Sequence, residues 1–170
     1  MRARFTSSRG GSLIEIALFI PLILTLMVGM EQLGRITYTY YTLRKIVYTA
    51  ARYVGTQQGV NFCDAADATV TAAKNYAVTG TTDASVDPFI PGLTPDMLDV
   101  RIERYDPVAQ SLDQCDCSVT GCDASQGGQA PDFVVVSIPD GYPFLPRIPF
   151  LTQIDPIPLK PQVRVPFGGT

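Results

Sequence analysis

Histidine and tryptophan are both absent from this chain of 170 residues. Without histidine the chain lacks the commonest general base and the commonest metal ligand, and it cannot form a Ser-His-Asp or Cys-His arrangement. Its three lysines, Lys45, Lys74 and Lys160, stand in no catalytic motif, and no pair of acidic residues does so either. The composition therefore argues against an enzyme.

Positive charge is also scarce. The chain has 13 basic and 16 acidic residues, a net charge of −3. Removing residues 1–10 would take away three arginines and leave a net charge of −6. Such a surface offers no basic patch for a phosphate backbone, so we expect no nucleic-acid partner.

The most conspicuous stretch is an apolar run at residues 13–30, interrupted by a single charged residue, Glu15. In a helix, eighteen residues span about 27 Å, close to the hydrocarbon thickness of a bilayer. Arg2, Arg4 and Arg9 precede the run without an acidic residue, which favours a cytoplasmic N-terminus and an exported remainder. No small-residue signal peptidase site follows the run. A carboxylate inside a membrane helix is costly, so Glu15 is expected to have a partner.

The segment RGGSLIE at residues 9–15 and the apolar continuation with Pro21 resemble the start of TadE-like minor pilins (pseudopilins) of tight-adherence pili, a type IV-related system. The likeness continues through residues 29–35 and 50–53, and more faintly through 134–144. The resemblance implies that a prepilin peptidase cuts between Gly10 and Gly11, so that Glu15 becomes the fifth mature residue. It also implies that Glu15 accepts the charge of a neighbouring subunit's new amine at Gly11.

By this resemblance the chain is a structural or adhesive subunit that contributes to the assembly or the tip of the pilus. The implied partners are other pilin subunits through the N-terminal helix, the inner membrane before assembly, the prepilin peptidase and the assembly machinery. The head would lie outside the cytoplasm, first at the inner membrane and then in an extracellular pilus or a periplasmic pseudopilus. The alternative is an uncleaved, membrane-anchored envelope domain that binds a surface or a partner protein.

The sequence predicts a leader at residues 1–10 and one long helix at residues 11–58, with its membrane or filament-core part at 13–30. Pro21 removes one backbone donor and can bend the helix there. Tyr38, Tyr41 and Tyr48 lie away from the apolar stripe and suit either a membrane interface or neighbouring subunits. Beyond the membrane, apolar residues recur at steps of three and four, which predicts packing against a head: Ile36, Tyr40, Leu43, Val47, Ala51 and Val54.

Residues 59–170 are expected to form an exported α+β head that, with the long helix, gives a pilin-like fold. A short helix is predicted at about 65–78, where Ala66, Val70, Ala73 and Ala77 share a face. An antiparallel sheet of about three strands is predicted, from alternating residues at 98–103 and 162–165 and from a further strand at 133–138. Eight of the fourteen prolines fall between 139 and 166, so this tail should be extended or turn-like rather than helical.

Four cysteines fall in the expected head: Cys63 alone, and Cys115, Cys117 and Cys122 in a Gly/Asp/Ser-rich insertion at residues 111–129. In an exported protein these predict two disulfides with three possible connectivities, all of which join Cys63 to the insertion. A four-thiolate zinc site is the alternative, but the Cys-x-Cys spacing suits it poorly. The aspartates of the insertion lack the spacing of a calcium loop, and no haem-attachment motif is present. We expect no metal and no cofactor.

Overall fold

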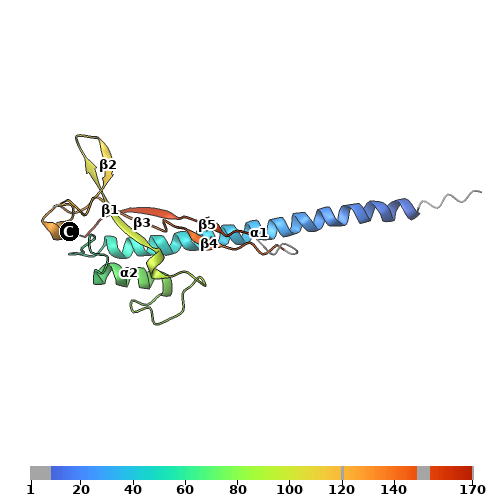
Figure 1. Cartoon of the computed structure of the whole chain (residues 1–170), viewed down its shortest axis with the longest axis horizontal. Coiled ribbons are helices and arrows are strands. Elements are labelled where there is room, and N and C mark those ends of the chain that lie inside the picture. Colours follow the sequence, from blue (N-terminus) through green and yellow to red (C-terminus); the bar gives the residue numbers. More distant parts are fainter. Residues whose placement is uncertain (1–8, 120, 149–153, 170) are drawn as a thin grey trace, which may run out of the picture.

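The longest element is helix α1 (Arg9–Gly55), which carries a small α+β head at its C-terminal end (Figure 1). The computed structural model describes residues 9–119, 121–148 and 154–169. With 47 residues, α1 spans about 70 Å. The prediction of one long helix followed by a head is confirmed, and the helix ends three residues before the expected residue 58.

The two halves of α1 have opposite surroundings. The apolar window near its N-terminus, long and apolar enough to cross a membrane, is not buried anywhere along its length. The second half is buried under the head at Leu43, Val47 and Ala51, each 0% exposed. Tyr40 was expected in this buried stripe but is 38% exposed, whereas Ile46 and Ala50, which were not expected in it, are 5% and 0% exposed. The amphipathic half therefore belongs to the head and the apolar half projects from it.

A four-stranded antiparallel sheet in the order β2-β1-β3-β6 covers α1. Three of its strands match the predicted ones, and the fourth, β2, lies in the short polar segment SLDQ, which lacks the alternation of a strand. A separate two-stranded sheet pairs β4 with β5. The strand bounds are β1 (Asp99–Asp106), β2 (Ser111–Gln114), β3 (Phe133–Ser137), β4 (Tyr142–Phe144), β5 (Ile157–Leu159) and β6 (Gln162–Pro166).

The core lies between the sheet, α1 and the second helix, α2 (Ala68–Thr79). Both α2 and the sheet contact α1, and Figure 1 shows β6 and α2 on opposite sides of it. The three central valines of β3, residues 134–136, are fully buried. Burial of apolar side chains from all three elements makes the head one packed unit around the end of α1.

Helix α2 begins at Ala68 because Asp67 caps it. The Asp67 carboxylate accepts hydrogen bonds from the backbone N–H groups of Thr69 and Val70, at 2.8 and 3.0 Å. Ala66, which was expected on the apolar face, lies before the helix and is exposed. At the other end Gly80 adopts φ +86°, a left-handed conformation that glycine takes without a steric penalty.

Candidate functional site

The residues predicted for leader processing lie in the first turns of α1. The helix begins at Arg9, so the Gly10–Gly11 bond is inside it. Glu15 is exposed and stands four residues after Gly11, which places the two positions on one face of the helix, one turn apart. Within residues 9–119, 121–148 and 154–169, no cation forms an ion pair with Glu15. Its carboxylate is therefore available to a group outside this molecule.

Pro21 lies inside α1 without ending it. Proline has no N–H, so the carbonyl of Ala17 loses its usual helical partner. One turn further on, the Thr25 hydroxyl donates a hydrogen bond of 2.8 Å to the Pro21 carbonyl. The helix thus continues through a position that has one hydrogen bond fewer than its neighbours, and a flexible point at Pro21 stays a prediction.

The apolar half of α1 presents an unpartnered surface. Twelve large apolar side chains between Ile14 and Leu33 are 50–73% exposed, and they point to all sides of the helix. Monomeric soluble proteins rarely expose a contiguous apolar surface of this length. Lipid or other apolar helices are the surroundings that would remove it from water.

Gln32 joins α1 to the segment that follows β4. This residue is only 7% exposed, and its side-chain amide N–H donates to the Arg147 carbonyl at 2.7 Å. Its amide oxygen accepts from the Arg147 N–H at 3.2 Å. The pair joins residues 115 positions apart. A lone glutamine after an apolar run carries no sequence signal for such a contact, so the sequence could not predict it.

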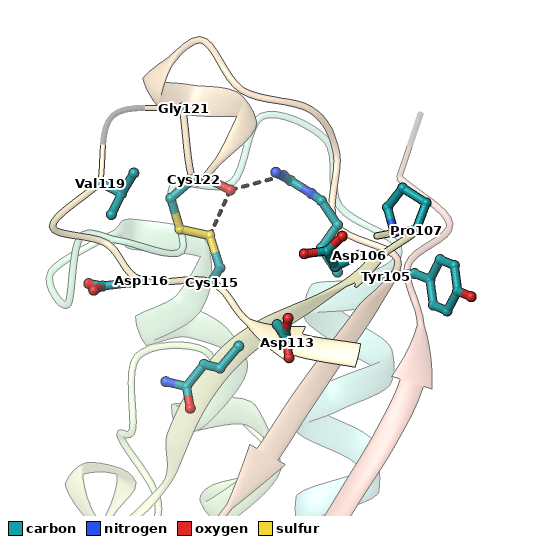
Figure 2. A pocket seen from close by; sticks show the side chains of 11 residues that line it. Tyr105, Asp106, Pro107, Asp113, Cys115, Asp116, Val119, Gly121 and Cys122 are labelled. Atoms are coloured by element: carbon teal, nitrogen blue, oxygen red, sulfur yellow. Dashed lines mark hydrogen bonds between the residues drawn. A yellow bond between two sulfur atoms is a disulfide. The ribbon is translucent and has the colours of Figure 1, made fainter. Parts of the chain in front are cut away.

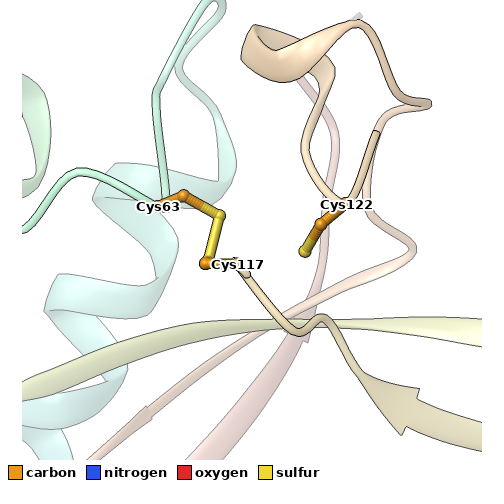
Figure 3. A group of neighbouring side chains, drawn as sticks. All are labelled: Cys63, Cys117 and Cys122. Atoms are coloured by element: carbon orange, nitrogen blue, oxygen red, sulfur yellow. A yellow bond between two sulfur atoms is a disulfide. The ribbon is translucent and has the colours of Figure 1, made fainter. Parts of the chain in front are cut away.

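The structure brings the four cysteines together at the end of the head that is remote from the apolar half of α1. Cys63 pairs with Cys117, with 5.3 Å between their Cα atoms, and Cys115 pairs with Cys122, with 5.5 Å between theirs. The first bridge ties the connection between α1 and α2 to the insertion (Figure 3). Of the three connectivities that the sequence allows, this is the one the structure adopts.

The same four cysteines were the alternative zinc ligands. The sulfur atoms of Cys63, Cys117 and Cys122 lie within 4.8 Å of one another, so they are close enough for a common ion. Zinc binds thiolates, and all four cysteines are paired in disulfides. A metal at this position would therefore require both bridges to be reduced first.

Asp123 reinforces the contact between the insertion and the rest of the head. Its side chain is 0% exposed, and one carboxylate oxygen accepts a 2.6 Å hydrogen bond from the Phe62 N–H, next to Cys63. The calcium alternative grouped Asp123 with Asp113 and Asp116, but these two line an open cavity while Asp123 is buried away from it. The three carboxylates do not form one cluster.

That cavity, of about 430 Å³, lies between the β1–β2 hairpin and the Cys115–Cys122 bridge (Figure 2). The Arg104 guanidinium on its wall donates to the carbonyls of Cys122, at 2.9 Å, and of Gln129. Hydrogen bonds from the Ser118 N–H and hydroxyl lower the pKa of Asp116 below its ordinary value. The Arg104 and Ser118 hydrogen bonds hold the insertion in shape, and among the described residues that line the cavity no nucleophile is hydrogen-bonded to a base.

Residues 10–52 match the family described as TadE-like protein. The match spans Gly10, Gly11, Glu15 and Pro21, so the resemblance to TadE-like pilins of tight-adherence pili is confirmed over this segment. The match lies within α1 and does not extend beyond it. No curated protein and no solved structure matches the chain.

Proposed function

From its TadE-like N-terminal segment, we propose that this chain is a minor pilin or pseudopilin that enters a tight-adherence pilus and serves in its assembly or at its tip. The family match over residues 10–52 carries this proposal. It is supported by the exposed apolar half of α1, which needs a bilayer before assembly and other helices afterwards. The head, held on the same helix, would then be displayed on the surface of the filament.

The proposed maturation divides the chain into three parts. Residues 1–10 are a cytoplasmic leader, residues 11–58 contain the assembly helix, which ends at Gly55, and residues 59–170 form the exported head. A prepilin peptidase would cut between Gly10 and Gly11 and create a new amine at Gly11. The head starts outside the cytoplasm at the inner membrane and later reaches the pilus or pseudopilus.

In the filament, Glu15 of one subunit would face the Gly11 amine of its neighbour. Such a pair is strengthened by the low dielectric among packed helices. The free-energy cost of removing both charges from water is nearly as large as the free energy gained from their attraction. The pair should therefore determine the register of neighbouring helices more than it stabilises their association.

Intact mass and N-terminal sequencing of the protein from envelope and sheared-pilus fractions test the proposal. A mature N-terminus at Gly11 in the sheared fraction is the expected result. A chain that keeps residues 1–10 and is found only in the envelope would contradict it, and would favour the alternative, an uncleaved anchored domain that binds a surface or a partner.

Replacement of Glu15 tests the mechanism separately. Glu15→Gln should leave membrane insertion unchanged and strongly reduce incorporation into pili, because the amide cannot balance the charge of the neighbour's amine. Glu31→Gln is the matched control, since Glu31 is an exposed carboxylate on the same helix beyond the apolar run. Equal incorporation of the two variants, measured by immunoblotting of sheared pili, would rule out the register role of Glu15.

A further inference from the structure

The base of the head lies at the level where the apolar half of α1 ends. A hydrocarbon core of about 30 Å takes about 20 helical residues, so a span that begins near Ile14 ends near Leu33. The headgroup layer adds roughly 5–8 Å, which corresponds to about three to five further residues. Gln32 is bound to Arg147 through both of its amide groups. The backbone of Arg147 is thereby held at the outer limit of the hydrocarbon.

Four side chains at this level form what we call the collar: Arg35 and Tyr38 on α1, and Leu145 and Arg147 after β4. They line one cavity of about 450 Å³ together with residues of the β4 region and the segment around Phe89. Tyr38 is 76% exposed and Leu145 is 61% exposed. An apolar side chain and a tyrosine thus lie exposed at the level where the helix would leave the hydrocarbon layer.

Two arginines make the collar cavity locally cationic. The cavity is lined by their guanidinium groups and by no carboxylate. Glu31, an exposed carboxylate, lies one helical turn before Arg35, but across the part of the chain that the structure describes neither Arg35 nor Arg147 forms an ion pair. The mature chain as a whole would have a net charge of −6, so a cavity lined by two arginines and no carboxylate departs from the average surface.

We propose that the collar binds the headgroup layer of an anionic bilayer on the exported side of the membrane. Guanidinium groups bind phosphate oxygens bidentately, and tyrosine favours the interface between hydrocarbon and water. Leu145 enters the upper hydrocarbon, and the two arginines contact lipid phosphates. The head then rests on the membrane before the subunit leaves it, instead of swinging freely on α1.

This inference rests on the membrane-inserted state in the proposed function, but it requires neither leader cleavage nor entry into a filament. It can therefore fail while the proposed function holds, and it can hold for an uncleaved anchor. The complete chain reconstituted into phospholipid vesicles is the appropriate sample.

The absence of tryptophan from the chain allows single-tryptophan reporters. Leu145→Trp places the reporter in the collar, and Val108→Trp is the matched control, because Val108 is 92% exposed in the β1–β2 turn, far from the apolar half of α1. In vesicles that contain phosphatidylglycerol and lipids brominated in the upper acyl chain, Leu145→Trp should lose fluorescence and emit at shorter wavelength. Val108→Trp should show neither change.

The contribution of the two arginines to lipid binding is tested by comparing anionic vesicles with phosphatidylcholine vesicles. Quenching of Leu145→Trp should be stronger in the anionic vesicles, and adding Arg147→Gln should remove most of this difference. The Gln32 hydrogen bonds use only backbone atoms of residue 147, so this substitution leaves the junction in place. Arg52→Gln, an exposed arginine at the far end of α1, should leave the difference unchanged.

Three results would overturn the proposal. Leu145→Trp that is quenched no more than Val108→Trp would show that the collar does not reach lipid. Equal quenching in anionic and neutral vesicles would show that the arginines do not bind headgroups. A shift to shorter wavelength that depends on protein concentration, without quenching by lipid, would assign the collar to a second copy of the chain.

Discussion

Removal of the Cys63–Cys117 bridge should destabilise the head more than removal of the Cys115–Cys122 bridge. The first bridge closes a separation of 54 residues and the second a separation of 7. With these lengths, the loop-closure estimate is about 4 kcal/mol for the first and about 2.4 kcal/mol for the second. The first bridge stabilises the head more because it closes the longer loop. A longer loop reduces the conformational entropy of the unfolded chain by a larger amount.

A local contact also makes removal of the Cys63–Cys117 bridge more destabilising than removal of the Cys115–Cys122 bridge. The Cys63–Cys117 bridge and the hydrogen bond from the Phe62 N–H to Asp123 both connect the segment before α2 with the insertion. Without the bridge, the hydrogen bond to the buried Asp123 carboxylate remains but the covalent link is lost. The Cys115–Cys122 bridge lies within the insertion, and its loss leaves the connection to α2 in place.

Thermal unfolding of the full-length chain in detergent measures the difference. We compare the double variants Cys63→Ser/Cys117→Ser and Cys115→Ser/Cys122→Ser by near-ultraviolet circular dichroism, which follows the packed tyrosines rather than the apolar helix. At roughly 3 °C per kcal/mol for a chain of this size, Tm should fall by about 12 °C in the first and by about 7 °C in the second.

A reductant provides the control, because it should lower Tm of the unsubstituted protein and leave a variant without cysteines unchanged. Peptide mapping of the oxidised protein should recover Cys63 linked to Cys117. Recovery of Cys63 linked to another cysteine, or a larger Tm decrease in the Cys115→Ser/Cys122→Ser variant, would refute the reasoning.

Two further predictions concern local hydrogen bonds. Asp67→Ala should lower the free energy of unfolding by about 1 kcal/mol, because two N–H groups of α2 lose their acceptor; chemical denaturation measures this, and an unchanged midpoint would contradict the capping role. In an NMR titration Ser118→Ala should raise the pKa of Asp116 toward its ordinary value but not fully, since the backbone N–H remains; an unchanged pKa would exclude the hydroxyl as a cause. Because the pKa of Asp116 is lowered in the folded protein, its small stabilising contribution is present at neutral pH and should be lost as pH falls through that lowered pKa.

The helices and the central strands could be predicted because their signals are local. The apolar run of α1, the alternation in β1 and the run of valines in β3 can each be recognised within a window of about ten residues. The short β2 and the β4–β5 pair were not predicted, since a strand of three or four residues with polar or proline-rich sequence has no periodicity to read. These short segments are strands because they pair with neighbouring strands, which a local sequence pattern does not reveal.

The candidate site also combines features that a local motif predicts with features that required the fold. The roles of Gly10, Gly11 and Glu15 were implied by the resemblance of this segment to TadE-like minor pilins and stay predictions, although the family match covers the segment. The pairing of Cys63 with Cys117, and the placement of Asp123 beside it, required the fold, because three connectivities were equally compatible with the spacing. The contact between Gln32 and Arg147 had no signal in the sequence at all.

A long apolar helix with an acidic residue near its start, an α+β head and cysteines able to form bridges can all be predicted from the amino-acid sequence. These features follow from composition and periodicity, which act over short stretches of chain. The fold was needed to show which cysteines pair, which carboxylate is buried, and that Gln32, next to the end of the apolar run, binds the segment after β4. Those features join residues up to 115 positions apart, and their partners are selected by the packing of the whole head around α1 rather than by any local pattern.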